Sequence, residues 1–158
     1  IMPLVDRTRV AVNCMVDPPD LVMQGDGDAI RRLLVNLLTN AVKHTAEGTI
    51  CITVREAVAR GRRQIEITCR DKGEGIDPNV CAKLGEPFAL NAGLGGGQHV
   101  TGSGLGLAIC KGIVAAHAGT ITVRSKRDCG TTFSVTLEAD LDEARSSNEP
   151  INIAQEAA

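Results

Sequence analysis

The chain has 158 residues, which suffices for one well-packed domain and makes two full domains implausible. Its 17 Lys and Arg against 19 Asp and Glu give a net charge of -2, which argues against non-specific binding to nucleic acid. Hydrophobic residues make up 43% of the chain, which excludes a disordered chain. With no Trp or Tyr and only 2 Phe, a surface that stacks on nucleic-acid bases is disfavoured. No apolar run approaches the roughly 18 residues of a membrane span.

The first half of the chain is predicted to form strands and one long helix. Alternating apolar residues predict a strand over residues 9–16, followed by a turn and a short strand around residues 21–24. From Asp26, a candidate helix N-cap, apolar residues recur at three- and four-residue offsets for several turns, which is typical of one helical face. Alternation over residues 50–55 and 65–70 then predicts two half-buried strands paired as a hairpin.

The second half is predicted to contain a long loop, a helix and a second hairpin. Residues 89–103 hold five glycines without periodicity, which favours a functional or disordered loop. Helical spacing returns over residues 104–118, and a hairpin joins residues 120–126 to 131–138. This order predicts an α+β layer fold with helices on one face of a mostly antiparallel sheet. Residues 140–158, with five acidic residues and one Arg, are predicted to be an acidic linker or disordered tail.

One stripe of the long helix is polar. Asn36, Asn40, Lys43 and His44 are spaced three or four residues apart and share one side of the helix. An Asn amide oxygen suits a hard cation such as Mg²⁺, which takes few protein ligands together with phosphate oxygens, and Lys43 would then meet a phosphate. The alternative is the ordinary solvated face of an amphipathic helix.

Two polar residues fall at positions where the strand pattern points inward. Asp71 has the parity of the apolar residues of the strand before it, and an inward carboxylate needs a hydrogen-bond donor, for which the exocyclic amine of adenine is one candidate. Gly73 and Gly75 would let backbone approach a flat base, although an ordinary turn is the alternative. Thr131 shares the inward parity of Phe133, beside the place of Asp71, or else bonds to neighbouring backbone.

Alternating glycines open the second helix. Gly102, Gly104 and Gly106 lie in the run Thr101–Leu107, where free N–H groups and the helix dipole can bind phosphate without a side chain. The spacing matches neither the dinucleotide fingerprint nor the Walker motif.

In this order the motifs resemble those of the ATP-binding catalytic domain of sensor histidine kinases, over about residues 9–138. They correspond to the N box, first glycine box, F box, second glycine box and closing strand of that family: Asn36–Thr45, Asp71–Gly75, Glu86–Phe88, Gly102–Ile109 and Gly130–Phe133. The resemblance implies the Bergerat fold of the GHKL superfamily over residues 1–139. That fold is a two-layer sandwich whose mixed, mostly antiparallel sheet of about five strands carries about three helices on one face, with residues 89–103 as ATP lid.

The resemblance also implies roles for single residues, with ATP and Mg²⁺ as cofactors. Asn40 looks like the Mg²⁺ ligand, Lys43 like a phosphate contact and Asp71 like the adenine acceptor, with Thr131 supporting it through water. The amides of residues 104–106 would hold the phosphates. Asn36, Asn40 and Lys43 are expected to be catalytic and also to contact the nucleotide. The further expected nucleotide contacts are His44, Gly73, Gly75, Ile76, Gly102, Ser103, Gly104, Leu105, Gly106 and Leu107.

The residue four positions before Asn40 separates branches of this superfamily. Gyrase-like hydrolases carry a Glu there that activates water, whereas Asn36 cannot take a proton from water near neutral pH. The resemblance therefore favours phosphoryl transfer to a histidine on a separate dimerisation and phosphoacceptor domain. His44, His99 and His117 lack the sequence context of an acceptor and are interpreted as structural or solvated, so the acceptor domain is expected upstream.

Other features keep alternatives open. The lid, residues 89–103, lacks the Arg or Lys common in the family, so a degenerate nucleotide-binding regulatory module without phosphotransfer is the alternative function. A protein-serine kinase of the same fold is disfavoured by Asn36.

The six cysteines have no paired spacing, which favours buried thiols over a redox sensor. It also favours a cytoplasmic or other reducing compartment for this segment. Such a location is compatible with a longer protein that is anchored to a membrane. Expected partners are the phosphoacceptor domain, a response regulator receiver domain and a second copy in a homodimer, with no nucleic acid and no membrane contact by this segment.

Overall fold

A five-stranded mixed sheet carrying two helices makes up most of the part of the chain that the computed structural model describes, residues 9–76, 105–139 and 151–152. In chain order the elements are β1 (Val10–Asp17), β2 (Val22–Met23), α1 (Gly27–His44), β3 (Gly48–Ala59), β4 (Arg62–Arg70), α3 (Leu105–Ala116), β5 (Thr120–Lys126), β6 (Gly130–Glu138) and β7 (Ile151–Asn152). The strands predicted from alternation and the helices predicted from three- and four-residue spacing are all present.

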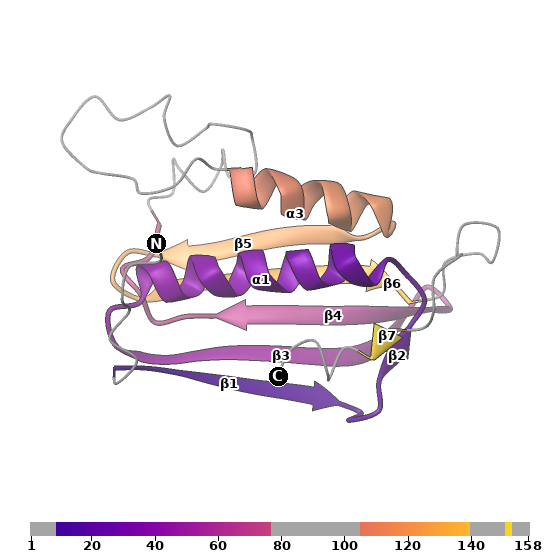
Figure 1. Cartoon of the computed structure of the whole chain (residues 1–158), viewed down its shortest axis with the longest axis horizontal. Helices are drawn as coiled ribbons and strands as arrows, with labels where there is room; N and C mark the ends of the chain where they lie inside the picture. The colour runs from indigo at the N-terminus through magenta and orange to yellow at the C-terminus, as the bar shows by residue number, and fades with distance from the viewer. Residues whose placement is uncertain (1–8, 77–104, 140–150, 153–158) are drawn as a thin grey trace.

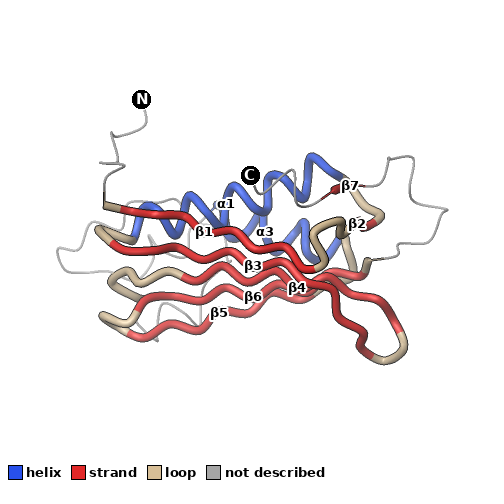
Figure 2. The backbone as a smooth tube through the Cα atoms, turned by 90° about the horizontal axis from the view of Figure 1, so that it is seen from below, coloured by secondary structure: helices blue, strands red, loops and turns tan. Residues whose placement is uncertain are grey.

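The sheet has the strand order β1-β3-β4-β6-β5. β1 pairs with β3 in parallel, and the other neighbours pair antiparallel. Figures 1 and 2 show α1 and α3 together on one face of this sheet, so the predicted α+β layer fold is confirmed. The third helix implied by the resemblance is not among the described residues. None of the described helices combines the length and the apolar character needed to span a bilayer.

The core between the layers is aliphatic, as the near absence of aromatic residues requires. Helix α1 buries one stripe, and the strands supply the other half of the core from their inward positions. The buried residues of α1 are Ile30, Leu33, Leu34, Leu37 and Ala41. Those of the three central strands are Ile50, Ile52, Val54, Ile65, Ile67, Cys69, Phe133, Val135 and Leu137. Burial of this apolar surface fixes the helix against the sheet and determines which stripe of α1 is left for other contacts.

The two helices are tied together at the start of α1. Asp26 caps the helix, its side chain accepting from the N–H of Ala29 at 3.0 Å. The N–H of Asp26 donates to Nε2 of the buried His117 at 3.3 Å, and Nδ1 of His117 donates to the carbonyl of Ile113 at 2.8 Å. Both ring nitrogens are used, so His117 has a structural role in which it links the end of α3 to the start of α1.

β2 and β7 form a second, small sheet, and the N–H of Gln24, directly after β2, donates to the carbonyl of Ala139, directly after β6, at 2.9 Å. Ala139 is buried and its N–H donates to the carbonyl of Arg63 at 3.0 Å, while β7 pairs antiparallel with β2. The domain boundary placed after residue 139 and the acidic tail remain predictions.

We expect replacement of Asp26 by Ala to lower the free energy of unfolding by about 1 kcal/mol, because the cap bond to Ala29 is lost. Urea denaturation followed by circular dichroism measures this change. Asp26→Ser keeps a capping oxygen and should retain most of the stability. Equal stability of the wild type and the Ala variant would show that the cap contributes nothing.

Candidate functional site

The carboxylate of Asp71 lies buried where β4 ends and β6 begins. Its side chain is 3% exposed, and Oδ1 accepts from the N–H groups of Gly73 at 2.9 Å and Thr131 at 3.1 Å. The N–H of Asp71 in turn donates to the carbonyl of Thr131 at 2.9 Å, which extends the β4–β6 pairing by one residue. The predicted inward direction of Asp71 and its place beside Thr131 are therefore observed, and among the described residues Oδ2 has no hydrogen-bond partner.

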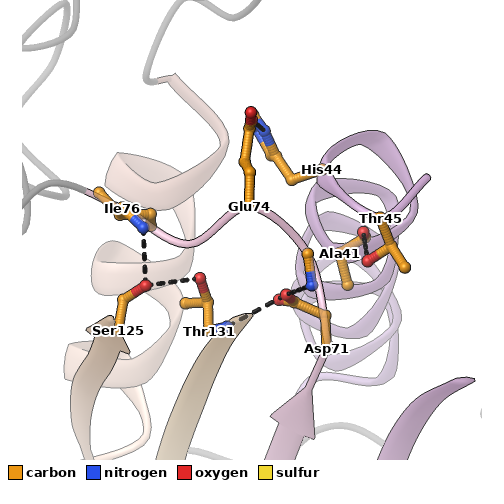
Figure 3. Close-up of polar contacts among 9 residues, drawn as sticks. Ala41, His44, Thr45, Asp71, Glu74, Ile76, Ser125 and Thr131 are labelled. Carbon is orange, nitrogen blue, oxygen red and sulfur yellow. Dashed lines mark hydrogen bonds and ion pairs between the residues drawn. The ribbon is translucent and has the colours of Figure 1, made fainter. Parts of the chain in front are cut away.

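Ser125 connects this carboxylate region to the loop after β4. Its Oγ accepts from the N–H of Ile76 at 2.8 Å, donates to the carbonyl of Gly130 at 3.0 Å and lies 2.9 Å from Oγ1 of Thr131. Figure 3 shows Ser125, Thr131 and Asp71 beneath the loop that carries Glu74 and Ile76. Ser125 is not among the site residues predicted from the sequence. Its inward parity with Ile121 and Val123 is the same kind of signal that identified Asp71.

The loop after Asp71 is packed against backbone at both of its glycines. A Cβ on Gly73 would overlap the carbonyl oxygen of His44, and one on Gly75, which has φ +72°, would overlap that of Lys126. Only glycine fits such close approaches. The loop is therefore held between the end of α1 and the β5–β6 turn. The close contacts observed are with protein backbone, and an approach to a flat base stays a prediction.

A side-chain pair joins α1 to the same loop. Nδ1 of His44 lies 3.0 Å from Oε1 of Glu74, with the two side chains 35% and 70% exposed. The N–H of Glu74 donates to the carbonyl of His44 at 3.3 Å, and its carbonyl accepts from the N–H of Asp128 at 2.8 Å. A side-chain contact as exposed as this one contributes little stability by itself, about 0–1 kcal/mol, but it fixes the direction of both side chains.

The polar stripe of α1 faces the start of α3 at Asn36. Nδ2 of Asn36 is buried and makes no close hydrogen bond among the described residues, and the amide lies beside the thiol of Cys110, whose pKa burial raises and this amide lowers. Oδ1 of Asn36 would lie 3.7 Å from a Cβ on Gly106, in the first turn of α3. Asn40, half-buried, and Lys43, exposed, follow at four and seven residues along α1 and so share this side of the helix.

The structure thus joins one group of the predicted site residues in a hydrogen-bond network, which Ile76 enters through Ser125, and sets a second group on facing helices. Asp71, Gly73, Ile76 and Thr131 are joined by hydrogen bonds, His44 reaches them through Glu74, and Asn36 meets the segment Leu105–Leu107. The F box at residues 86–88, the lid at residues 89–103 and residues 102–104 of the second glycine box lie outside the described residues.

The buried cysteines near the site are unreactive thiols. Burial, reinforced by the negative charge of Asp71, raises the pKa of Cys69 to about 12. Burial also raises the pKa of Cys110 to about 11. Because the thiolate is the reactive form, both side chains stay protonated and inert at neutral pH, which favours the structural interpretation for these two residues.

Comparison with known proteins gives matches over most of the chain. The family model described as histidine kinase-, DNA gyrase B- and HSP90-like ATPase matches residues 25–141. Sensor histidine kinase AtsR of Burkholderia thailandensis is 40% identical over 142 residues, which are 88% of this chain and 23% of AtsR. Sensor histidine kinase RcsC of Escherichia coli is 34% identical over 137 residues, 86% of this chain and 14% of RcsC. The chain therefore spans less than a quarter of the length of these relatives.

Solved structures share the fold. Full-length ShkA in complex with AMPPNP matches with a TM-score of 0.68 and 26% identity, covering 84% of this chain and 26% of ShkA. The nucleotide-free catalytic domain of the histidine kinase ThkA matches with a TM-score of 0.70 and 24% identity, covering 87% of this chain and 85% of that domain.

Gly73→Ala is expected to destabilise the protein by about 1–3 kcal/mol, because the new Cβ overlaps the carbonyl oxygen of His44 and forces the loop away from α1. Gly112→Ala is the matched control: a Cβ there meets nothing within 4 Å, and Ala in α3 should add roughly 0.5–1 kcal/mol of stability. Chemical denaturation of the two variants tests the difference. A Gly73 variant as stable as the wild type would contradict the packing of this loop.

Proposed function

Because the chain belongs to the family of histidine kinase-, DNA gyrase B- and HSP90-like ATPases, we propose that it binds Mg-ATP as the catalytic domain of a sensor histidine kinase. In this proposal it transfers the γ-phosphoryl group to a histidine on a separate dimerisation and phosphoacceptor domain. AtsR and RcsC are named sensor histidine kinases, and this chain corresponds to a minor part of each, which supports a longer protein with further domains.

The buried carboxylate of Asp71 is the observation that carries the proposal. Two backbone N–H groups hold Oδ1, and Oδ2 has no partner among the described residues although the side chain is 3% exposed. Oδ2 is not sealed from solvent, since Nδ2 of Asn36 is the fully buried side-chain atom without a close partner among the described residues. A ligand that covers Oδ2 must therefore supply a donor to offset the loss of hydration. The exocyclic amine of adenine would supply one, and with the base at Asp71 the nucleotide would extend toward the polar stripe of α1.

The amide of Asn36, which has no strong acceptor among the described residues, supports a triphosphate at the facing helices. Its Nδ2 has the Cys110 thiol as its neighbour, and a phosphate oxygen would be a stronger acceptor than this weakly accepting sulfur. The start of α3 lies opposite, where helix N–H groups and the dipole favour an anion. Lys43, exposed on the same side, adds a positive charge.

The same stripe fits magnesium held jointly by protein and nucleotide. Asn40 offers a hard amide oxygen one turn beyond Asn36, and Mg²⁺ takes one or two protein ligands together with phosphate oxygens and water. When bound, the ion would neutralise charge on the phosphates. The chain's own residues would position the nucleotide, with Asp71 at the base and Asn36 and Lys43 at the phosphates.

Transfer is favoured over hydrolysis by the amide at position 36, which cannot act as a general base for water. Within the described residues, His117 uses both ring nitrogens for structural hydrogen bonds and His44 pairs with Glu74. Neither is therefore a suitable acceptor, which supports an acceptor histidine on another domain. A response regulator receiver domain and a homodimer of the longer protein belong to the same proposal.

Asp71→Asn is expected to weaken Mg-ATP binding at least about tenfold, because the amide would present N–H to the adenine amine while its oxygen stays with the backbone donors. Isothermal titration calorimetry measures the affinity. Asp28→Asn, at a side chain that is 94% exposed, is the control and should bind as the wild type does. Equal affinity of the Asp71 variant would remove this residue from the adenine site.

A protein that contains this chain together with the proposed phosphoacceptor domain should incorporate label from γ-³²P-ATP into an acid-labile phosphohistidine. Asn40→Ala should reduce the rate by at least tenfold, because the expected Mg²⁺ ligand is lost. Thr39→Ala, at an exposed neighbouring position, is the control. Nucleotide binding without any label on histidine would instead establish the regulatory nucleotide-binding module and reject the kinase.

A further inference from the structure

Ser125 is the centre of a hydroxyl network that joins three segments of the chain. Its Oγ contacts the N–H of Ile76 in the loop after β4 and Oγ1 of Thr131 (Figure 3). It also contacts the carbonyl of Gly130 at the start of β6. The three distances are 2.8, 2.9 and 3.0 Å, so all are within hydrogen-bond range.

Counting protons fixes the direction of the bond between the two hydroxyl groups. A serine hydroxyl has one proton and two lone pairs. The N–H of Ile76 can only donate, so it occupies one lone pair of Ser125, and the carbonyl of Gly130 can only accept, so it takes the proton. All three contacts are satisfied together only when Thr131 donates its proton to the remaining lone pair of Ser125.

Thr131 is then left with lone pairs alone, next to a carboxylate that also can only accept. The N–H of Thr131 donates to Oδ1 of Asp71, and both side chains are buried. The two side chains therefore present acceptors and no donor at this end of the site. A purine with an amino group at position 6 offers the matching N–H, whereas one with a carbonyl group there places a third acceptor against them.

We propose that Ser125 is a positioning residue that makes the site selective for 6-aminopurine nucleotides by holding the Thr131 hydroxyl as an acceptor. The inference rests on the proposed function, since it requires the nucleobase to lie at Asp71. Ser125 acts through Thr131 and through the N–H of Ile76, and does not itself need to touch the base.

The test compares ADP with IDP, which has a carbonyl oxygen in place of the 6-amino group, by calorimetry in the presence of Mg²⁺. The wild type should bind ADP more tightly. In Ser125→Ala the Thr131 hydroxyl is free to rotate and donate to the carbonyl oxygen of IDP. The preference for ADP over IDP, measured as the ratio of the two affinities, should therefore fall about three- to tenfold. This change corresponds to the free energy of one neutral hydrogen bond. A residue that merely stabilises the fold would weaken both ligands equally, and an unchanged ratio would overturn the proposal.

Further variants test the proposal without relying on the Ser125→Ala variant alone. In a Thr131→Val background, Ser125→Ala should leave the ratio unchanged; a fall as large as in the wild type would refute action through Thr131. Ser125→Cys keeps the side-chain shape with a weaker acceptor, so that if the Ala variant does not fold the Cys variant must still show a reduced ratio. Ser134→Ala, at an exposed position of β6, is the control and should behave as the wild type.

The outcomes also separate the two proposals. A wild type that binds neither nucleotide overturns the proposed function and the role of Ser125 with it. A wild type that prefers ADP, with the same preference in a folded Ser125→Ala variant, overturns the role of Ser125 alone.

Discussion

The carboxylate of Asp71, withdrawn from water and fixed by two backbone donors, is the interaction on which the rest of the site depends. Its Oδ1 holds the N–H of Thr131 at the start of β6 and that of Gly73 in the following loop. The desolvation of such a group is offset only if both donors stay in place. One carboxylate therefore aligns the end of β4, the start of β6 and the glycine loop, and leaves its second oxygen without a partner among the described residues.

Helix α1 provides the other wall of this arrangement because its two sides have different surroundings. The apolar side is fixed by the aliphatic core, so the side that carries Asn36, Asn40 and Lys43 has a set direction. Both ends of the helix are held as well. The start is capped by Asp26 and contacts His117, and the end meets the glycine loop through the backbone and side chain of His44. A helix restrained at both ends is suited to positioning a ligand with little loss of entropy on binding.

The family includes both kinases and hydrolases, so the fold alone leaves the reaction open. The amide at position 36 is what favours transfer, since it can bind an anion but cannot take a proton from water. Nδ2 of Asn36, which has only the weakly accepting thiol of Cys110 beside it among the described residues, agrees with an anion-binding role. Because the chain spans less than a quarter of the sensor kinases AtsR and RcsC, the histidine that would receive the phosphoryl group is placed in another domain by the same proposal.

Among the described elements, the sequence by itself determined the two helices, the strands of the large sheet and β2, but not β7. It also determined the side of the sheet on which each key residue lies. Side chains alternate along a strand with a period of two, so Asp71 and Thr131 had to share the side of the core residues, and the spacing after Asp26 left one helical stripe apolar. Only the tertiary structure decided which of these residues meet. Ser125 bonds to Ile76, 49 residues away in the chain, and His44 to Glu74, 30 residues away. Such contacts depend on which strands pair and on how the loop crosses them, and the periodicity of one segment contains no information about its partner.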